Sequence, residues 1–401
     1  MKKPLNVRRS DVMPRVQEAM QCFRSPLIDS MRANGNRLEL PGLHISLASS
    51  FGFCDGVSRA IEIAYAACLA YPERRIWLIG EIIHNPEVNA KLDALGLRRL
   101  PWNPHDAAYE LVQEQDLVII PAFGITRELR DTLEAKGVDY ADTTCGNVIK
   151  VWSKVQSYAR RGITSIIHGK ARHEESLATA SRSRGDDGCG KYLIIYNKAD
   201  AEFVADFLNG RVSTADFNNR FAGCTSPGFD PEQDLMSIGM ANQTTMLKGE
   251  TVEIQGILRR AVIERDGREE RFHACNTICS ATQDRQDALF ALLEEQPDAM
   301  FIIGGYNSSN TTHLAGIAAE RVPTFFVRDA ESLLSLQQVR CLNLRTRTEE
   351  LTPLPPQAAD LTRTWRIGIT AGASCPANVI EQVIRRLADL RTGTTDSVLP
   401  E

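Results

Sequence analysis

The sequence predicts an α/β protein with parallel sheets, built from three similar units. Two observations lead to this prediction. Short apolar runs alternate with stretches of helical period along most of the chain, which is the pattern of βαβ units. In addition, three cysteines lie in turns directly before helix-like stretches, and the turns that follow them recur at matching distances. Strands that alternate with helices in this way place the fold in the α/β class.

Each expected strand is an apolar run that ends in a glycine-rich or polar turn. The runs are at residues 76–80 (IWLIG), 117–121 (LVIIP), 164–168 (TSIIH), 300–305 (MFIIGG) and 365–370 (WRIGIT). The helices expected after them are at residues 86–96, 125–137, 174–181, 311–321 and 376–390. From these elements we predict an N-terminal extension at 1–42, α/β units at 43–140, 141–275 and 276–375, and a C-terminal helix and tail at 376–401.

Composition excludes several classes of protein. The net charge of −5 argues against a nucleic-acid binder, which usually carries a basic excess. No apolar run approaches the roughly 20 residues that a membrane-spanning helix needs. The basic N-terminus has no apolar core of the kind found in secretory signals. We therefore expect a cytoplasmic protein, or one of the plastid stroma if the chain comes from a plant.

Three cysteines stand at equivalent places in the predicted repeat. Cys54, Cys145 and Cys279 each precede a helix-like stretch, and His84, His173 and Ser308 follow them after 30, 28 and 29 residues. A third special turn completes each unit: Phe123 in PAFG, Gln243 and Thr244 in ANQTT, and Ser374 in AGAS. Ligands of open α/β sheets lie beyond the carboxyl ends of the strands, so three such ends facing inward would enclose one site.

Three thiols in these places leave several interpretations open. Zinc in structural sites prefers four closed ligands, often supplied by short CxxC turns, and none occurs here. A cubane iron–sulfur cluster normally takes four thiolates, so three would leave one iron open. Cys275 and Cys375 are alternatives for a fourth ligand. On spacing alone, a cluster and a purely structural role for the cysteines both remain open. We interpret Cys68, Cys189, Cys224 and Cys341 as small buried apolar residues.

The polar turns indicate a site for a small phosphorylated ligand. Ser308, Ser309 and Asn310 stand where a helix is expected to start, as does Ser374. Such residues commonly cap helices, and helix N-termini also bind phosphate. No Walker motif is present, which disfavours a nucleotide. The segment HGKARHEES is the candidate for proton transfer, because it places several titratable side chains at a strand-to-helix turn.

Taken together, these segments resemble the LytB or IspH family of 4-hydroxy-3-methylbut-2-enyl diphosphate reductases. The resemblance runs from about Phe51 to about Ile380. It rests on FGFCDGVSRAI, EIIHNPEVNAKL, DTTCGNVIKVW, HGKARHEE, ANQTTMLKGET, NTICSATQDRQDA, GGYNSSNTTHL and TAGAS, in that order. Eight segments in this order are far more specific for the family than any single motif would be.

The resemblance implies a trefoil of three α/β domains around one central 4Fe-4S cluster, held by Cys54, Cys145 and Cys279 with one iron open. It implies reductive removal of the substrate hydroxyl to yield isopentenyl and dimethylallyl diphosphate in the non-mevalonate pathway. Glu175 matches the proton-delivering glutamate of the family. The implied diphosphate ligands are His84, His173, Ser308, Ser309, Asn310 and Ser374, with Gln243 and Thr244 near the reacting end of the substrate.

Two residues depart from the family pattern. Many bacterial members have histidine where this chain has Phe123, so no diphosphate contact is carried over to that position. Gly146 stands where proline usually follows the second cysteine. PAFG and the N-terminal extension are typical of the cyanobacterial and plant-type branch, for which ferredoxin or flavodoxin is the expected electron donor. We expect a monomer or homodimer.

Three alternatives remain at this point. The first is a related enzyme that reduces a different phosphorylated alcohol. The second is a non-catalytic iron–sulfur sensor, which would need the three cysteines but not Glu175 or the Ser-Ser-Asn turn. The third is a zinc-binding structural protein, which the visible spectrum of anaerobically purified protein would distinguish from the others.

Overall fold

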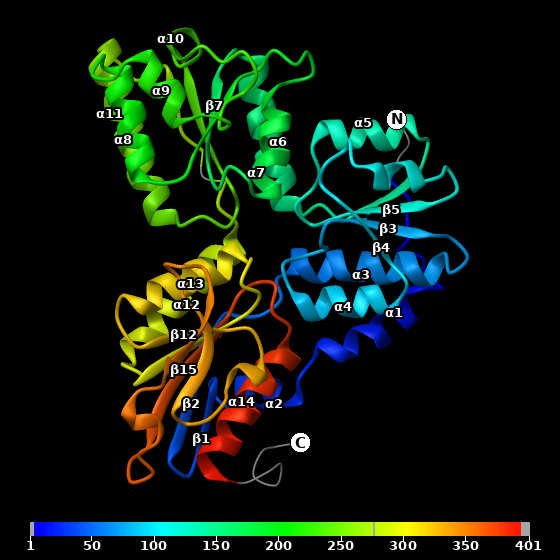
Figure 1. Ribbon diagram of the computed structural model, residues 1–401, viewed down its shortest axis with the longest axis vertical. Coiled ribbons are helices and arrows are strands. Elements are labelled where there is room, and N and C mark those ends of the chain that lie inside the picture. The colour runs from blue at the N-terminus through cyan, green and yellow to red at the C-terminus, as the bar shows by residue number, and fades with distance from the viewer. Residues whose placement is uncertain (1–3, 276, 394–401) are drawn as a thin grey trace. The chain divides into compact units, whose positions relative to one another are not determined.

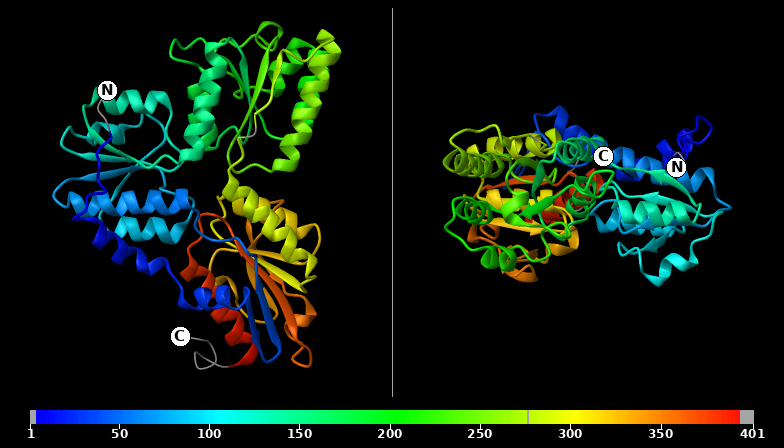
Figure 2. Two further views of the ribbon diagram at one scale, coloured as in Figure 1. Left: turned by 180° about the vertical axis from the view of Figure 1, so that it is seen from behind. Right: turned by 90° about the horizontal axis from the view of Figure 1, so that it is seen from above.

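The computed structural model describes residues 4–275 and 277–393 of the chain. The chain divides into two compact units. The Cys145 unit comprises Met1–Val7, Ala70–Ile82 and Leu95–Cys279, and the Cys54 unit comprises Arg8–Leu69, Ile83–Ala94 and Ser280–Glu401. Figures 1 and 2 show that helices surround strands in both units.

The Cys145 unit contains two parallel sheets of four strands each. The first sheet has the order β4 (Arg98–Leu100), β3 (Ile76–Ile79), β5 (Leu117–Ile120) and β6 (Asp139–Asp142), accompanied by η2 (Ala107–Leu111) and α5 (Arg127–Ala135). Every residue of β3 and β5 is buried. Continuous apolar runs of this kind are typical of parallel strands that are covered on both faces.

The second sheet of the Cys145 unit has the order β10 (Phe272–His273), β9 (Ile238–Asn242), β7 (Thr164–His168) and β8 (Tyr192–Ile195). Its helices are α6 (Gly146–Arg160), α7 (Glu174–Ser183), α8 (Lys198–Leu208), α9 (Thr214–Arg220), α10 (Pro231–Asp234) and α11 (Lys248–Asp266). Helices α8 and α11 lie side by side (Figure 1). Helix α11 ends at Gly267, whose φ of 70° is a left-handed conformation that suits glycine.

The Cys54 unit is built on one sheet of five strands. The order is β1 (Arg37–Leu40), β2 (Leu43–Leu47), β15 (Trp365–Ala371), β11 (Ala299–Ile303) and β12 (Thr324–Val327). Strands β1 and β2 form an antiparallel hairpin, and the other pairs are parallel. A separate hairpin joins β13 (Gln338–Leu342) and β14 (Glu349–Pro353).

Helices complete the Cys54 unit. They are α1 (Met13–Met20), α2 (Pro26–Ala33), α3 (Asp55–Ala70), α4 (Pro86–Ala94), α12 (Ser280–Glu294), α13 (Ser309–Ala319) and α14 (Ala377–Thr392), with short 3-10 turns η1 (Gln21–Phe23), η3 (Ala330–Ser332) and η4 (Pro356–Ala358). Leu27 and Ile28 of α2 are fully buried against Phe301, Trp365 and Ile380 of the main core. Helix α2, which lies within the predicted N-terminal extension, is therefore part of the core of this unit.

The predicted fold class, α/β with parallel sheets, is confirmed. Strand β2, at the start of the predicted unit 43–140, pairs with β15 near the C-terminus. Strand β1 lies within the predicted extension 1–42. The three unit boundaries and the trefoil stay predictions. The predicted tail from residue 394 onward lies outside the described residues, as do residues 1–3 and 276.

Within the described part of the chain, no helix is both long enough and apolar enough to cross a bilayer.

Candidate functional site

The Cys54 unit collects three turns at one edge of its sheet. Strands β2, β15 and β11 are parallel neighbours, so the turns that follow them lie at the same carboxyl edge. The turn after β2 leads to Cys54, which is partly exposed and directly precedes α3. The amide of Cys54 donates to the carbonyl of Ala373 over 3.3 Å, which joins the first turn to the AGAS turn after β15.

His84 belongs to the same edge. Its carbonyl accepts a hydrogen bond from Ser374 Oγ over 3.2 Å, and its Nδ1 lies 3.3 Å from Asn307 Nδ2. A Cβ atom at Gly305 would come within 2.6 Å of the His84 carbonyl, so only glycine permits this close approach. Residues from three distant segments are thus packed together in the Cys54 unit.

The Ser-Ser-Asn turn forms the N-terminus of α13. Ser308 is the N-cap, as predicted: its Oγ accepts from the Thr311 amide over 3.3 Å and from Thr311 Oγ1 over 2.9 Å. Asn310 is only 3% exposed, and neither its Oδ1 nor its Nδ2 has a hydrogen-bond partner among the described residues. A buried polar group without a partner costs about 1–3 kcal/mol, a cost that a ligand bound at this amide would offset.

The Cys145 unit holds the other two cysteines of the predicted set. Cys145 is the N-cap of α6, and its amide donates to the Ala122 carbonyl over 3.0 Å. Asn147, in the first turn of α6, donates from Nδ2 to Cys279 Sγ over 3.0 Å. The first turn after Cys145 therefore contacts the thiol of Cys279 directly. Gly146 occupies the first helical position, where an added Cβ would meet no atom within 4 Å.

Glu175 is held by Thr244. Its Oε1 accepts from the Thr244 amide over 2.6 Å, and its Oε2 accepts from Thr244 Oγ1 over 3.1 Å. The side chain is buried, at 3% exposure. The amide of Cys279 donates to the Thr244 carbonyl over 3.1 Å, so one threonine links the carboxylate to a cysteine of the predicted ligand set.

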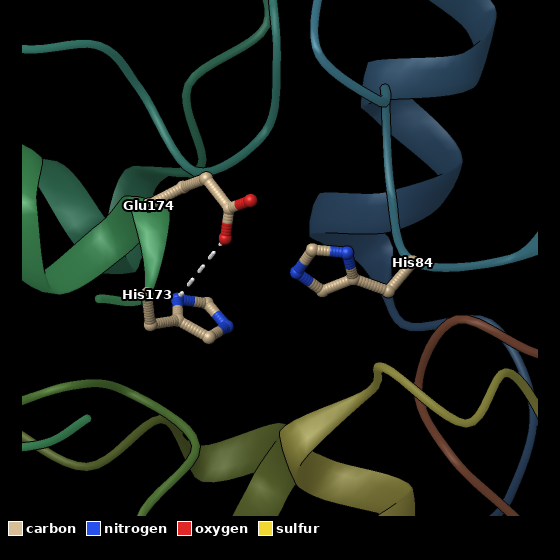
Figure 3. A group of neighbouring side chains, drawn as sticks. All are labelled: His84, His173 and Glu174. Carbon is tan, nitrogen blue, oxygen red and sulfur yellow. Dashed lines mark ion pairs between the residues drawn. The ribbon is translucent and has the colours of Figure 1, made fainter. Parts of the chain in front are cut away.

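Glu174 is placed differently, although it is the neighbouring residue. Its side chain is partly exposed, and Oε2 lies 3.8 Å from Nδ1 of His173 (Figure 3). His173 caps α7: its Nδ1 accepts the Glu175 amide hydrogen over 3.2 Å. When the imidazole is neutral, this bond places its proton on Nε2, which is then a donor. The ring of Phe123 lies edge-on to His173, with centroids 5.9 Å apart.

The side chain of Gln243 forms hydrogen bonds both within its own turn and to a distant segment. Its Oε1 accepts from the Lys170 amide over 3.1 Å and from Ser176 Oγ over 3.3 Å, and its Nε2 donates to Thr245 Oγ1 over 2.9 Å. These bonds fasten the ANQTT turn to the HGKARHEES turn. They support a positioning role for Gln243 in addition to the predicted place near the substrate.

A buried polar network joins His168 at the end of β7, Asn242 at the end of β9 and Thr251 of α11, and it was not predicted. His168 Nδ1 lies 2.9 Å from Thr251 Oγ1, and Nε2 lies 3.2 Å from the Tyr196 carbonyl. Burial lowers the pKa of His168 to about 4, so the ring is neutral near pH 7. The side chain of Asn242 donates from Nδ2 to Thr251 Oγ1 over 2.7 Å, and its backbone amide donates to Thr277 Oγ1 over 2.7 Å. The network thus reaches a residue two positions before Cys279, and only the polar residues in HGK, ANQ and NTIC could have indicated it.

The remaining cysteines differ in their burial. Cys341 is buried as predicted and Cys68 and Cys224 are partly exposed, whereas Cys189 is exposed, so the prediction that it is a buried apolar residue is wrong. Burial raises the pKa of Cys68 to about 12, and it also raises the pKa of Cys341 and Cys375. A buried thiol of this kind resists the deprotonation that metal binding requires. Cys375 is fully buried among apolar residues of the main core, which disfavours it as a fourth ligand.

Comparisons with known proteins agree with this picture. The family model described as LytB protein matches residues 45–388. A protein of Synechococcus sp. (strain RCC307), named 4-hydroxy-3-methylbut-2-enyl diphosphate reductase, is 45% identical over 374 residues, covering 92% of this chain and 89% of its own length. A protein of Gloeobacter violaceus with the same name is 42% identical over 379 residues, covering 92% and 88%.

Two solved structures are also similar. One is of (E)-4-hydroxy-3-methyl-but-2-enyl diphosphate reductase, the terminal enzyme of the non-mevalonate pathway, with 28% identity, a TM-score of 0.53 and coverage of 86% of this chain and 99% of that chain. The other, a reductase from Plasmodium falciparum, has 22% identity, a TM-score of 0.64 and coverage of 88% and 90%, which supports the fold alone.

Proposed function

The chain belongs to the LytB protein family, and we propose that it reduces 4-hydroxy-3-methylbut-2-enyl diphosphate to isopentenyl and dimethylallyl diphosphate. This is the terminal step of the non-mevalonate pathway. One observation carries the proposal to this chain: the Asn310 side-chain amide, buried and without a hydrogen-bond partner among the described residues, offers the diphosphate a donor at the N-terminus of α13.

The residues fit a 4Fe-4S cluster held by Cys54, Cys145 and Cys279, with one iron left open. Each of these thiols is partly exposed and stands at the start of a helix, where backbone amides and the helix dipole favour a thiolate. When bound, the cluster would supply the two electrons that the reduction requires and an open iron that polarises the substrate hydroxyl.

Glu175 is proposed as the proton donor. Reductive dehydroxylation consumes two electrons and two protons: the carbon–oxygen bond breaks, the hydroxyl leaves as water, and a new carbon–hydrogen bond forms at either end of the allyl group. The two hydrogen bonds from Thr244 fix the carboxyl group of Glu175 in one orientation. This reduces the cost of aligning the group for proton transfer. Burial of the group excludes water that would compete as a proton source.

The diphosphate would be bound by His84, His173, Ser308, Ser309, Asn310 and Ser374. His173 is suited to this role because its capping bond leaves Nε2–H as the donor to an anion. Ser308 would share its hydroxyl with the helix cap. Gln243 and Thr244 would lie near the reacting end of the substrate, where Thr244 also orients Glu175.

The chain would receive electrons singly from a small redox protein, ferredoxin or flavodoxin, and act in the cytoplasm or stroma as a monomer or homodimer. The three sheets of four or five strands are consistent with the trefoil that we propose around the cluster. Anaerobic turnover of the hydroxylated diphosphate with a chemical reductant tests the activity without the protein donor. Formation of both five-carbon diphosphates is expected. An iron-loaded protein that forms neither would contradict the proposal.

A second candidate is reduction of a different phosphorylated alcohol by the same centre. The observation that favours it is Phe123, whose apolar ring lies edge-on to the ring of His173. Competition between the two alcohols under identical anaerobic conditions distinguishes the candidates, because the true substrate has the higher kcat/KM.

A further inference from the structure

Arg285 is a buried arginine on the helix that starts directly after Cys279. It lies in the second turn of α12 and is 4% exposed. Its Nη2 donates to the carbonyl of Gly52 over 2.5 Å, and its Nη1 donates to the carbonyl of Ala281 over 2.6 Å. One planar guanidinium therefore joins the first turn of α12 to the loop that carries Cys54.

The Cys54 loop adopts a conformation that glycine at position 52 permits. Gly52 has a φ of 76°, in the left-handed region, and a Cβ atom there would lie 3.4 Å from the carbonyl of Cys375. The amide of Cys54 is bonded to Ala373 on the AGAS turn, as described above. Arg285 adds a second attachment point, two residues before the thiol and from a different element. Hydrogen bonds from a charged donor are roughly twice as strong as neutral ones.

We propose that Arg285 is a positioning residue for the iron–sulfur centre, resting on the function proposed above. By fastening the Cys54 loop to the helix that continues from Cys279, it limits the freedom of two ligand-bearing segments before and after the metal binds. Outer residues that orient metal ligands typically affect metal retention by about 10–100-fold. Lysine is a poor replacement, because a single ammonium group cannot reproduce the fixed fork that serves both carbonyls.

Arg391 provides a matched control. It belongs to the same unit, is 5% exposed, and also donates to backbone carbonyls, including those of Gly42 over 3.0 Å and Ala358 over 2.7 Å. Gly42 lies between β1 and β2, at the end of β2 opposite the turn that leads to Cys54. Arg391 also donates to the carbonyls of Asp360 and Arg363, so its removal breaks several bonds from a buried guanidinium to the backbone without touching the Cys54 loop.

The test compares anaerobically purified parent, Arg285→Lys, Arg285→Met and Arg391→Met. Iron content, the electron paramagnetic resonance spectrum of the reduced protein and the rate of bleaching by an iron chelator are measured with the melting temperature. We expect Arg285→Met to bleach at least about tenfold faster than the parent with an altered spectrum. The bleaching rate of Arg285→Lys should lie between those of the parent and Arg285→Met. Arg391→Met should bleach within about twofold of the parent even where its melting temperature falls as far as that of Arg285→Met or further.

Two results would overturn the inference alone: parent-like bleaching and spectrum in Arg285→Met, or equal effects of the two methionine variants, which would indicate general destabilisation. A parent protein that assembles no iron–sulfur centre after anaerobic reconstitution would overturn the proposed function as well. The two failures are therefore distinguishable.

Discussion

Replacing Glu175 with glutamine tests the proposed proton donor with little change in shape. Glutamine can still accept the Thr244 amide hydrogen with Oε1, and its Nε2 can donate to Thr244 Oγ1 if the hydroxyl rotates. Replacing the carboxyl group by an amide at these two bonds should cost only about 0.5–1.5 kcal/mol of stability. Loss of a general acid should cost far more in the reaction, about 10²–10⁴-fold in kcat, equivalent to roughly 2.7–5.4 kcal/mol of activation free energy.

Glu174→Gln is the internal control for this experiment. Adjacent residues on a helix point about 100° apart, and Glu174 is partly exposed beside His173 while Glu175 is buried against Thr244. The ion pair between Glu174 and His173 requires a protonated His173 and spans 3.8 Å, so the effect of the glutamine variant on kcat should stay within a few-fold. Both variants should retain the iron content and visible spectrum of the parent.

The assay is anaerobic turnover with a chemical reductant, under steady-state and single-turnover conditions. Single-turnover rates separate proton delivery from product release. If Glu175→Gln turns over at the parental rate with full iron, or if Glu174→Gln is the inactive variant, the proton comes from another group and the assignment is wrong.

Three further predictions concern other residues. Cys145→Ser should lose most of the iron, whereas Cys68→Ser should keep it; elemental analysis would refute the ligand assignment if iron in the Cys145 variant were complete. Asn310→Ala should lower kcat/KM about ten- to a hundredfold, and an unchanged value would remove Asn310 from the site. His168 has a lowered pKa, so the unfolded state binds the extra proton, and the free energy of unfolding should fall as pH drops from about 6.5 to about 4. Denaturant titrations should show this loss, up to roughly 3 kcal/mol, and His168→Gln should flatten it while exposed His105→Gln should not.

Local sequence patterns were sufficient for the types of element and for several of their ends. The run TSIIH forms strand β7 with all five residues buried. The run MFIIGG, predicted at 300–305, contributes to β11, which spans Ala299–Ile303 and is also fully buried. Ser308 caps α13 because its hydroxyl reaches an amide only three residues along the chain. Interactions of this kind depend on a few consecutive residues, so they can be predicted without knowledge of the fold.

The sequence by itself therefore determined the α/β class, the helix starts at the three cysteines and the family to which the motifs point. Only the tertiary structure decided which strands are neighbours, as in the pairing of β2 with β15 across more than 300 residues. It alone placed Thr244 against Glu175, Asn242 against Thr277 and Arg285 against Gly52. The physical reason is that a hydrogen bond between distant segments depends on how whole sheets and helices pack, and no local periodicity encodes the partner of a buried polar group.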